Sequence, residues 1–366
     1  MGERKGSLEN RVSFANFYRG KKVLVTGHTG FKGGWLTAWL KSAGASVVGL
    51  ALPPETNPNL FDALCLGCEM VSIFGDICRP SIVNSVFAQH APEIVFHNAA
   101  QPLVRRSYRE PVETFDTNVM GTVHVLEAVR HTPSVRAVVV ITSDKCYENR
   151  EWFWGYREED ALGGSDPYSS SKACAELVTA AYRQSFFQKP GTAAVATARA
   201  GNVIGGGDWS EDRLVPDMVR GITSRQPIVI RRPDSVRPWQ HVLEPIRGYM
   251  LLAQTLWEKR ESAEAWNFGP RDQDAVSVAE LARRFITAWG AGELRVQPDP
   301  DAPHEAQSLR LNTSKARSRL GWNPVLDLNH AVAWTAEWYR SYEADPTSAV
   351  SVTAQQIQKY SEEARV

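Results

Sequence analysis

Hydrophobic and polar positions in the first two hundred residues follow two alternating patterns. Short, nearly unbroken apolar runs, typical of buried parallel strands, occupy 22–26, 45–51, 69–74, 93–97, 135–142 and 192–198. Segments with apolar residues at helical spacing lie between them, with the clearest examples at 80–90, about 111–131 and 168–188. Strand and helix therefore alternate, which predicts an α/β fold with a doubly wound parallel sheet.

After residue 200 the pattern changes to glycine-rich and proline-rich loops mixed with helices at 243–258, 276–289 and 328–343. The helix at 243–258 and the strand at 265–268 are expected to return to the sheet. We therefore predict a large first domain and a smaller, discontinuous C-terminal α/β domain. The expected parts are a loosely ordered leader at 1–18, the first domain at 19–200 with returning segments near 240–270, the second domain at 201–345, and a C-terminal tail at 346–366.

The turn after the first strand carries three glycines at intervals of three, Gly27, Gly30 and Gly33. The first permits a sharp turn, the second lets backbone N–H groups approach a pyrophosphate, and the third lets helix and strand meet. The start of the next helix adds partial positive charge toward phosphate. Because strand, turn and helix come in the required order, we predict a Rossmann-type dinucleotide site instead of a plain turn.

The residues after the second strand do not indicate whether the site prefers NAD or NADP. Many NAD-binding domains carry an acid there that holds the adenosine ribose. Here Leu52-Pro53-Pro54 follows, with no acid until Glu55 and no arginine for a 2′-phosphate. After the third strand, Asp76 suits either the adenine amino group or a turn and helix cap.

Tyr168 and Lys172 are the strongest catalytic signal in the chain, because residues four apart share one face of a helix. A phenol with a pKa of about 10 is a poor base at neutral pH. A cation at about 4 Å and an effective dielectric near 20 would favour the phenolate by about 4 kcal/mol, or about three pKa units. We therefore expect Lys172 to make Tyr168 a base for an alcohol or sugar hydroxyl.

Ser143, Asp144 and Lys145 follow the fifth predicted strand, at the edge where parallel sheets bind ligands. Ser143 can hydrogen-bond the same substrate oxygen as Tyr168. Asp144 and Lys145 add an acid and a potential base, which a simple alcohol dehydrogenase does not need. The alternative is a solvated strand end with two charged loop residues.

Composition excludes several classes of protein. The 366 residues include 41 basic and 41 acidic side chains, so bulk charge gives no reason to expect a nucleic-acid or membrane partner. No apolar run approaches the roughly 20 residues of a membrane span, and the charged N-terminal segment lacks the apolar core of a signal peptide. We expect a cytoplasmic protein with five reduced cysteines. The Cys65–Cys68 pair lacks the further ligands of a metal site.

Taken together, these motifs resemble the extended short-chain dehydrogenase/reductase family, particularly its nucleotide-sugar 4,6-dehydratases. The resemblance runs from about 20 to 324. It rests on the stretches 26–33, 97–101, 117–122 and 143–145, on Tyr168 with Lys172, on Arg199 and Asn202, and on 237–242. Asp144 is the main mark of a dehydratase, because related epimerases generally carry a small residue there.

The resemblance implies NAD as a tightly bound cofactor that is regenerated in each turnover, with no metal. The implied catalytic residues are Ser143, Asp144, Lys145, Tyr168 and Lys172. The implied cofactor contacts are Gly27, Thr29, Gly30, Phe31, Lys32, Gly33, Asp76, Ile77, Asn98, Ala99, Ala100, Asn118, Thr142, Tyr168 and Lys172. The implied substrate contacts are Gln101, Ser143, Asn202, Arg213, Leu214, Arg237, His304 and Glu305.

The implied substrate is a nucleoside diphosphate hexose, and the implied product is a 4-keto-6-deoxy sugar for deoxysugar biosynthesis. Most such dehydratases follow the aspartate with glutamate, whereas Lys145 stands here. Lys145 and the stretches 28–33 and 205–209 resemble the sequences of the family members that act on CDP-glucose. Lys145 in place of glutamate also leaves open which residue removes the C5 proton. GDP-mannose and dTDP-glucose remain alternative substrates, and 4-epimerisation the alternative reaction. The resemblance also implies a homodimer or a dimer of dimers, formed through the helices at 111–131 and 168–188.

Overall fold

The computed structural model describes residues 13–297 and 308–366. Its centre is a seven-stranded sheet in the order β11-β6-β5-β4-β1-β2-β3, with every neighbouring pair parallel. The strands are β1 (Lys22–Thr26), β2 (Ser46–Ala51), β3 (Val71–Phe74), β4 (Ile94–His97), β5 (Ala137–Ile141), β6 (Ala194–Ala200) and β11 (Ala265–Phe268). The predicted doubly wound sheet is confirmed, including the return of β11 to its edge.

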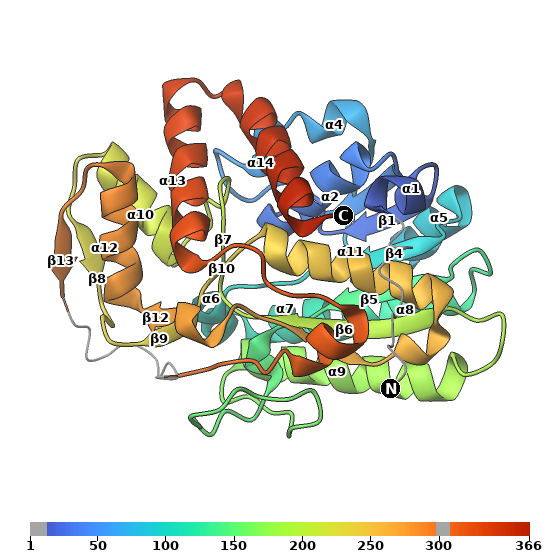
Figure 1. Cartoon of the computed structure of the whole chain (residues 1–366). Helices are drawn as coiled ribbons and strands as arrows, with labels where there is room; N and C mark the ends of the chain where they lie inside the picture. Colours follow the sequence, from blue (N-terminus) through green and yellow to red (C-terminus); the bar gives the residue numbers. More distant parts are fainter. Residues whose placement is uncertain (1–12, 298–307) are drawn as a thin grey trace, which may run out of the picture.

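Helices cover both faces of the sheet (Figure 1). One face is covered by α1 (Phe14–Tyr18), α2 (Phe31–Ser42) and α11 (Leu243–Glu258), and the other by α5 (Pro80–His90), α8 (Gly121–Arg130) and α9 (Pro167–Phe186). Strands β1, β4 and β5 are almost wholly apolar and buried, because neither face meets water. The strand order reverses between β1 and β4, which leaves a crevice at their carboxyl ends.

The connections near this crevice are short helices. They are α3 (Leu60–Ala63), α4 (Leu66–Glu69), α6 (Val104–Arg109), α7 (Pro111–Phe115) and the 3-10 turn η2 (Asp144–Cys146). The helix expected over 111–131 is interrupted by one π-helical turn, η1 (Asp116–Met120), between α7 and α8. Such turns displace the register of a helix locally and often occur at functional sites.

The smaller part of the molecule is built from the C-terminal half and lies beside the carboxyl edge of the sheet (Figure 1). Three two-stranded pairs belong to it: β7 (Val203–Ile204) with β10 (Gln240–His241), β8 (Ile228–Ile230) with β13 (Leu294–Val296), and β9 (Val236–Pro238) with β12 (Ala275–Ser277). The helices with them are α10 (Leu214–Thr223), α12 (Val278–Trp289) and α13 (Leu328–Ala344), with the short turn η4 (Asp272–Asp274). The turns η3 (Arg260–Ser262) and η5 (Ala316–Leu320) pack against α11 and the main sheet instead, η3 at β6 and η5 at β11.

Both ends of the described chain pack against the main domain. The expected leader reaches residue 18, but α1 buries Phe14, Phe17 and Tyr18, whose hydroxyl donates to the Met250 carbonyl at 2.7 Å. Phe14, Phe17 and Tyr18 are three and four residues apart, so they share one face of α1. Because this face is buried, residues 14–18 belong to the packed domain and not to a loose leader. The segment expected as a tail forms α14 (Ser348–Ala364), which packs on α2 and α13.

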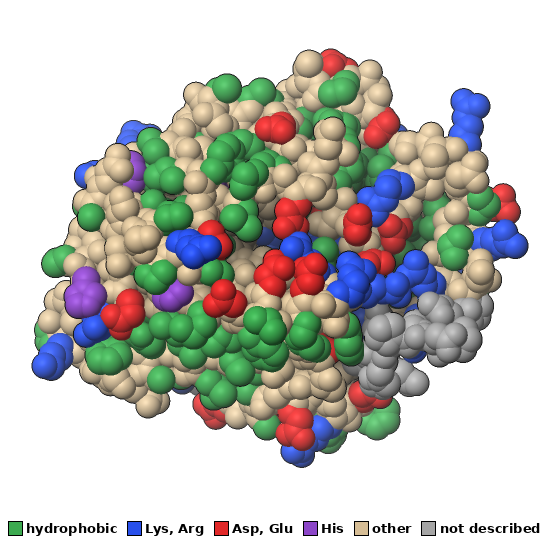
Figure 2. Space-filling model, turned by 180° about the vertical axis from the view of Figure 1, so that it is seen from behind, with side chains coloured by type: hydrophobic (Ala, Val, Ile, Leu, Met, Phe, Trp, Pro, Cys, Tyr) green, Lys and Arg blue, Asp and Glu red, His purple; other side chains and the backbone are tan. Residues whose placement is uncertain are grey.

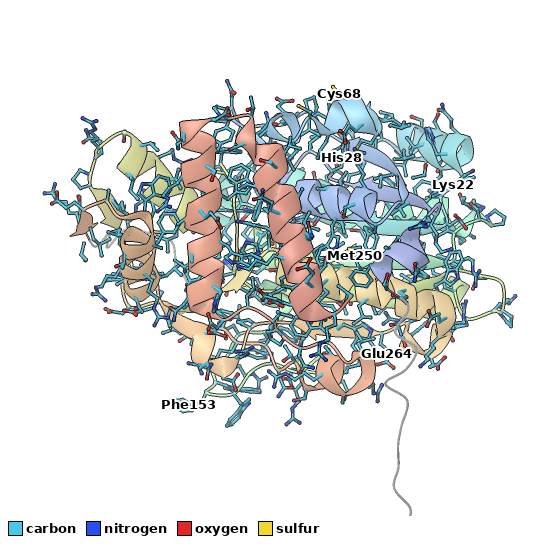
Figure 3. The ribbon with its side chains drawn as sticks, turned by 45° about the horizontal axis from the view of Figure 1, so that its top comes forward. Lys22, His28, Cys68, Phe153, Met250 and Glu264 are labelled. Carbon is cyan, nitrogen blue, oxygen red and sulfur yellow. The ribbon has the colours of Figure 1, made fainter. Side chains whose placement is uncertain are left out.

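The five cysteines are all free, and Cys68 lies at the edge of the molecule, on α4 (Figure 3). Within the described ranges, no cluster of histidine, cysteine or acidic side chains has the arrangement to hold a metal ion. None of the helices in this part of the chain has the length and apolarity that a membrane span requires.

Candidate active site

The carboxyl ends of β1, β4 and β5 open into a cavity of about 580 Å³ between the sheet and α10. Figure 2 shows acidic and basic side chains gathered around a hollow in this face of the molecule. Most of the predicted site residues line it: Gly27, Thr29, Gly30, Phe31, Lys32, Asp76, Ile77, Asn98, Ala99, Ala100, Gln101, Thr142, Ser143, Asp144, Lys145, Tyr168, Lys172, Asn202, Arg213, Leu214 and Arg237. Segments far apart in sequence therefore meet at one site.

The glycine-rich turn forms a cradle with the shape that a dinucleotide diphosphate needs. Gly27 has a φ of +76°, and a Cβ on it would lie 2.8 Å from the backbone of Ala99. A Cβ on Gly33 would lie 2.0 Å from the Gly27 carbonyl oxygen, so only glycine lets helix and turn meet here. Gly30 caps α2 without a side-chain hydrogen bond, which leaves the first backbone N–H groups of the helix for an anion.

Polar groups of the chain hold the walls of this cradle in place. The hydroxyl of Thr26 accepts hydrogen bonds from the backbone N–H groups of Asn98 and Ala99, both at 3.1 Å. The hydroxyl of Thr29 donates to the carbonyl of Leu52 at 2.9 Å. Asp76 accepts from the backbone of Cys78 at 2.8 Å while it lines the cavity, so it fills the turn position and faces the site at once.

Asn118 does not line the cavity, although the sequence places it among the cofactor contacts. Its side chain is buried in η1, where it accepts from the Gln101 backbone N–H at 2.8 Å and donates to the Gln101 carbonyl and to the Ser171 hydroxyl. The π-helical turn brings the amide to these partners. Asn118 therefore ties the loop after β4 to helix α9, and Gln101 is the residue that faces the cavity.

Ser143, Asp144 and Lys145 stand at the end of β5 as predicted. Asp144 is 3 % exposed, and burial raises the pKa of its carboxyl group, although Lys145, the Ser143 hydroxyl, Lys32 and Arg237 act in the opposite direction. The Ser143 hydroxyl donates to Asp144 Oδ1 at 3.0 Å. Oδ2 is buried without a hydrogen-bond partner among the described residues. A carboxyl group held in this way keeps its proton to a higher pH than an exposed aspartic acid does.

Tyr168 and Lys172 also reach the cavity from the first turns of α9, but their electrostatics differ from the expectation. Burial raises the pKa of Tyr168 to about 12, although a hydrogen bond from Ser143 and the charge of Arg213 lower it. Burial also lowers the pKa of Lys172 to about 8, and its amine donates to the Ile141 carbonyl at 3.4 Å. The expectation included the attraction of one cation but omitted the cost of burying a phenolate.

A buried ion pair joins α9, the helix that carries Tyr168 and Lys172, to strand β6. Arg199 on β6 and Glu176 on α9 are each 3 % exposed and lie 2.8 Å apart. The hydroxyls of Thr142 and Thr197 also donate to Glu176, at 2.5 Å and 2.6 Å. These bonds fix α9 against β5 and β6, and so fix Tyr168 relative to Ser143.

The opposite wall carries the groups predicted to hold a substrate diphosphate. Arg213, just before α10, pairs with Asp208 at 2.8 Å, and Arg237 lies on β9. Asn202 and Leu214 line the same wall. The predicted residues His304 and Glu305 lie outside the described residues.

Several cavity residues were not predicted from the sequence. Arg106 on α6 pairs with Glu55, on the loop after β2, at 3.0 Å. Its neighbour Arg105 pairs with Asp212, on the opposite wall, at 3.4 Å. Helix α6 is thus ion-paired to both sides of the cavity mouth. The adjacent arginines shortly after Gln101 were the available signal, but their partners are distant in sequence.

Comparison with known proteins agrees with this geometry. The family model described as GDP-mannose 4,6 dehydratase matches residues 24–335. The chain belongs to this family. Members of the family among its relatives include the CDP-glucose 4,6-dehydratase of Salmonella typhimurium, 51% identical over 332 residues, which are 89% of this chain and 92% of that protein. The dTDP-glucose 4,6-dehydratase of Xanthomonas campestris pv. campestris is 26% identical, over 86% of this chain and 92% of its own.

The fold of the family also recurs among solved structures. The dTDP-glucose 4,6-dehydratase DesIV of Streptomyces venezuelae, solved with NAD bound, superposes with a TM-score of 0.76. It is 22% identical, and the match covers 89% of this chain and 99% of that one. The predicted resemblance to the nucleotide-sugar 4,6-dehydratases is confirmed.

Proposed function

We propose that this chain converts CDP-glucose to CDP-4-keto-6-deoxyglucose with NAD as a resident cofactor, in the cytoplasm. The observation that carries the proposal is Asp144, a buried carboxyl group with a raised pKa in the same cavity as Tyr168. An enzyme that only oxidises or epimerises C4 has no need of a buried acid there. The 51% identity to a CDP-glucose 4,6-dehydratase supports the choice of nucleotide.

The first proposed step is oxidation of C4. Bound in the cradle, NAD supplies a hydride acceptor for C4 and, once reduced, a hydride donor for C6. Tyr168 takes the proton of the 4-hydroxyl group, while the Ser143 hydroxyl holds the same oxygen. Because burial raises the pKa of Tyr168, this proton transfer needs the positive charges of Lys172 and the oxidised cofactor beside the phenol.

Loss of water follows from the ketone, since it makes the C5 hydrogen acidic. Lys145 lines the cavity next to Asp144 and is our proposed acceptor of the C5 proton. Asp144 gives its own proton to the departing C6 oxygen, so water leaves instead of hydroxide. We propose that Arg213 and Arg237, on the opposite wall, bind the substrate diphosphate, because guanidinium groups can hold phosphate through two hydrogen bonds.

A panel of nucleotide sugars tests the proposal. We expect purified protein to release water from CDP-glucose without net accumulation of NADH, and to process dTDP-glucose, UDP-glucose and GDP-mannose far more slowly. Deuterium placed on C4 should appear on the new C6 methyl group in the mass spectrum of the product. An unchanged mass with inversion at C4 would identify an epimerase, and preference for another nucleotide would refute the choice of CDP-glucose.

We also propose that the chain forms a homodimer, or a dimer of dimers, through α7, η1 and α9. Large apolar side chains are exposed there, namely Val112, Met120, Leu177 and Phe186. Monomeric soluble proteins rarely expose a large contiguous patch of apolar side chains, so such a patch often marks an interface with another protein chain. Sedimentation equilibrium at micromolar concentration should show a dimer or tetramer, and a monomer would contradict this.

A further inference from the structure

Two lysine amines face the cavity without a protein partner. Nearly all other cations that line it within the described residues have an identified partner: Arg105 and Arg231 with Asp212, Arg106 with Glu55, Arg213 with Asp208, and Lys172 with the Ile141 carbonyl. Arg232 and Arg237 also have partners. The amines of Lys32 and Lys145 alone make no hydrogen bond or ion pair with this part of the chain. An amine left unpaired in a cavity is available to a ligand or to a reacting group.

The position of Lys32 is unfavourable for the helix that carries it. Lys32 is the second residue of α2, directly after the Gly30 cap. The positive end of the helix dipole lies there, so a cation destabilises the first turn. The family resemblance implied that Lys32 is one of the cofactor contacts. The structure places its amine within the field of groups on three other elements.

The charges around Lys32 belong to the reacting side of the cavity. Burial and the guanidinium of Arg213 lower the pKa of Lys32 to about 8, while the carboxyl groups of Asp144 and Asp208 raise it. Lys32 in turn lowers the pKa of Lys172 on α9 and of Asp144 on η2. The described charges near this amine therefore come from η2, α9 and the segment before α10.

We propose that Lys32 is a positioning residue for the elimination step, with its ammonium group stabilising the carboxylate that Asp144 becomes. In that step the Asp144 O–H bond breaks, the proton joins the C6 oxygen, the C6–O bond breaks with its electrons on oxygen, and one water leaves. The C5 proton passes to the neutral amine of Lys145, and the electrons of the C5–H bond form the C5=C6 double bond. Asp144 is left negative; Lys32, which lines the same cavity from α2, acts on its charge, as do Lys145 from η2 and Arg237 from β9. The inference rests on the proposed dehydratase activity.

The other charged or titratable groups around Asp144 are neutral in their usual states. Tyr168, Tyr249 and Cys146 all interact with this carboxyl group, and burial raises the pKa of each of them. The Ser143 hydroxyl donates to Oδ1. The described positive charges that balance a negative Asp144 are therefore those of Lys32, Lys145 and Arg237. Lys32 is the one of the three that lies on the cofactor side.

Three variants and one control test the proposal. Lys32→Met removes the charge, Lys32→Gln keeps polarity, and Lys32→Arg keeps the charge. Lys41→Met is the matched control, because Lys41 lies on the same helix and pairs with Glu69 outside the cavity. We expect Lys32→Met and Lys32→Gln to slow dehydration of CDP-glucose by about 10- to 100-fold, the order of one charge acting on a buried acid. Lys32→Arg should recover part of the rate, and Lys41→Met should equal the unmodified protein.

The pH profile separates this role from a structural one. Without Lys32, Asp144 has a higher pKa and is a weaker acid, so the rate falls most at low pH, where the carboxyl group is protonated in both proteins. At higher pH a larger fraction of Asp144 stays protonated in Lys32→Met than in the unmodified protein. The ratio of the unmodified rate to the variant rate should therefore become smaller as the pH rises. A loss of rate that is equal at every pH would overturn the proposal.

Two further measurements complete the test. Purified Lys32→Met should retain as much NAD as the unmodified protein; loss of NAD in proportion to activity would make Lys32 a ligand of the cofactor diphosphate and would refute the proposal. In an Asp144→Asn background, Lys32→Met should slow the reaction no further, and full additivity of the two changes would refute it as well. If the unmodified protein dehydrates no nucleotide sugar, the proposed function itself fails, which is distinct from these outcomes.

Discussion

Replacing Asp144 by asparagine should separate ketone formation from loss of water. Asparagine has nearly the same size, and its carbonyl oxygen can still accept from the Ser143 hydroxyl, which lies 3.0 Å from Oδ1. It has no proton to give to the departing C6 oxygen. Oxidation at C4 depends on Tyr168 and is expected to continue. The variant should therefore form the ketone and the reduced cofactor but release water slowly.

The size of the effect follows from the role of the side chain. A positioned general acid contributes about 10²- to 10⁴-fold, so the barrier to elimination should rise by about 3 to 5 kcal/mol. Stability should not fall at neutral pH. Burial raises the pKa of Asp144 in the folded protein, so folding at pH 7 opposes the ionised form that the unfolded chain prefers, and asparagine removes this cost. The free energy of unfolding should be equal or higher in the variant.

Rapid mixing with CDP-glucose provides the assay. The absorbance of NADH should rise and persist in Asp144→Asn, whereas in the unmodified protein it should stay near zero because the reduced cofactor is reoxidised at C6. Urea denaturation of both proteins controls for folding. Product formation at the unmodified rate would refute the assignment of Asp144 as the acid, and complete loss of the NADH signal would show that it acts before elimination.

Three further predictions concern the supporting chemistry. Tyr168→Phe should reduce turnover by at least about 100-fold while NAD content after purification is unchanged, because the ring still packs and only the hydroxyl is lost; retained turnover would refute its role as the base. Arg199→Met should lower the free energy of unfolding by about 3 to 5 kcal/mol in urea denaturation, since it leaves Glu176 buried without its ion-pair partner, and a change below 1 kcal/mol would contradict this. Burial lowers the pKa of His97 and of His241 to about 3, from an ordinary 6.5. The unfolded chain therefore binds more protons below pH 6.5, and urea denaturation should show stability falling by up to about 1.4 kcal/mol per pH unit per histidine as the pH drops toward 3; constant stability between pH 6 and 4 would refute this.

Much of the fold was predictable because the relevant signals are local. The β-branched runs predicted the strands of the parallel sheet, and the glycines at 27, 30 and 33 predicted the cradle after β1. Tyr168 and Lys172 share a face simply because a helix has 3.6 residues per turn. The order of strands and helices, in turn, brings the ends of β1, β4 and β5 to one edge. These properties depend on the spacing of residues along the chain, which can be read directly from the sequence.

Other features depend on which groups become neighbours and on how much water they lose. The phenol of Tyr168 is harder to ionise than its spacing to Lys172 predicted, because burial raises its pKa more than Ser143 and Arg213 lower it. Asn118 does not line the cavity, because its side chain, in the π-helical turn, bonds to the backbone of Gln101.

The sequence by itself determined the type and order of most elements, and with them most of the residues that surround the cavity. The tertiary structure alone decided the charge state of those residues. Lys32 shows the difference: the family resemblance implies a cofactor contact, whereas in the folded chain its amine is also subject to the charges of Asp144, Asp208 and Arg213. Electrostatic energy depends on distance and local dielectric, and neither quantity exists until segments far apart in the chain are packed together.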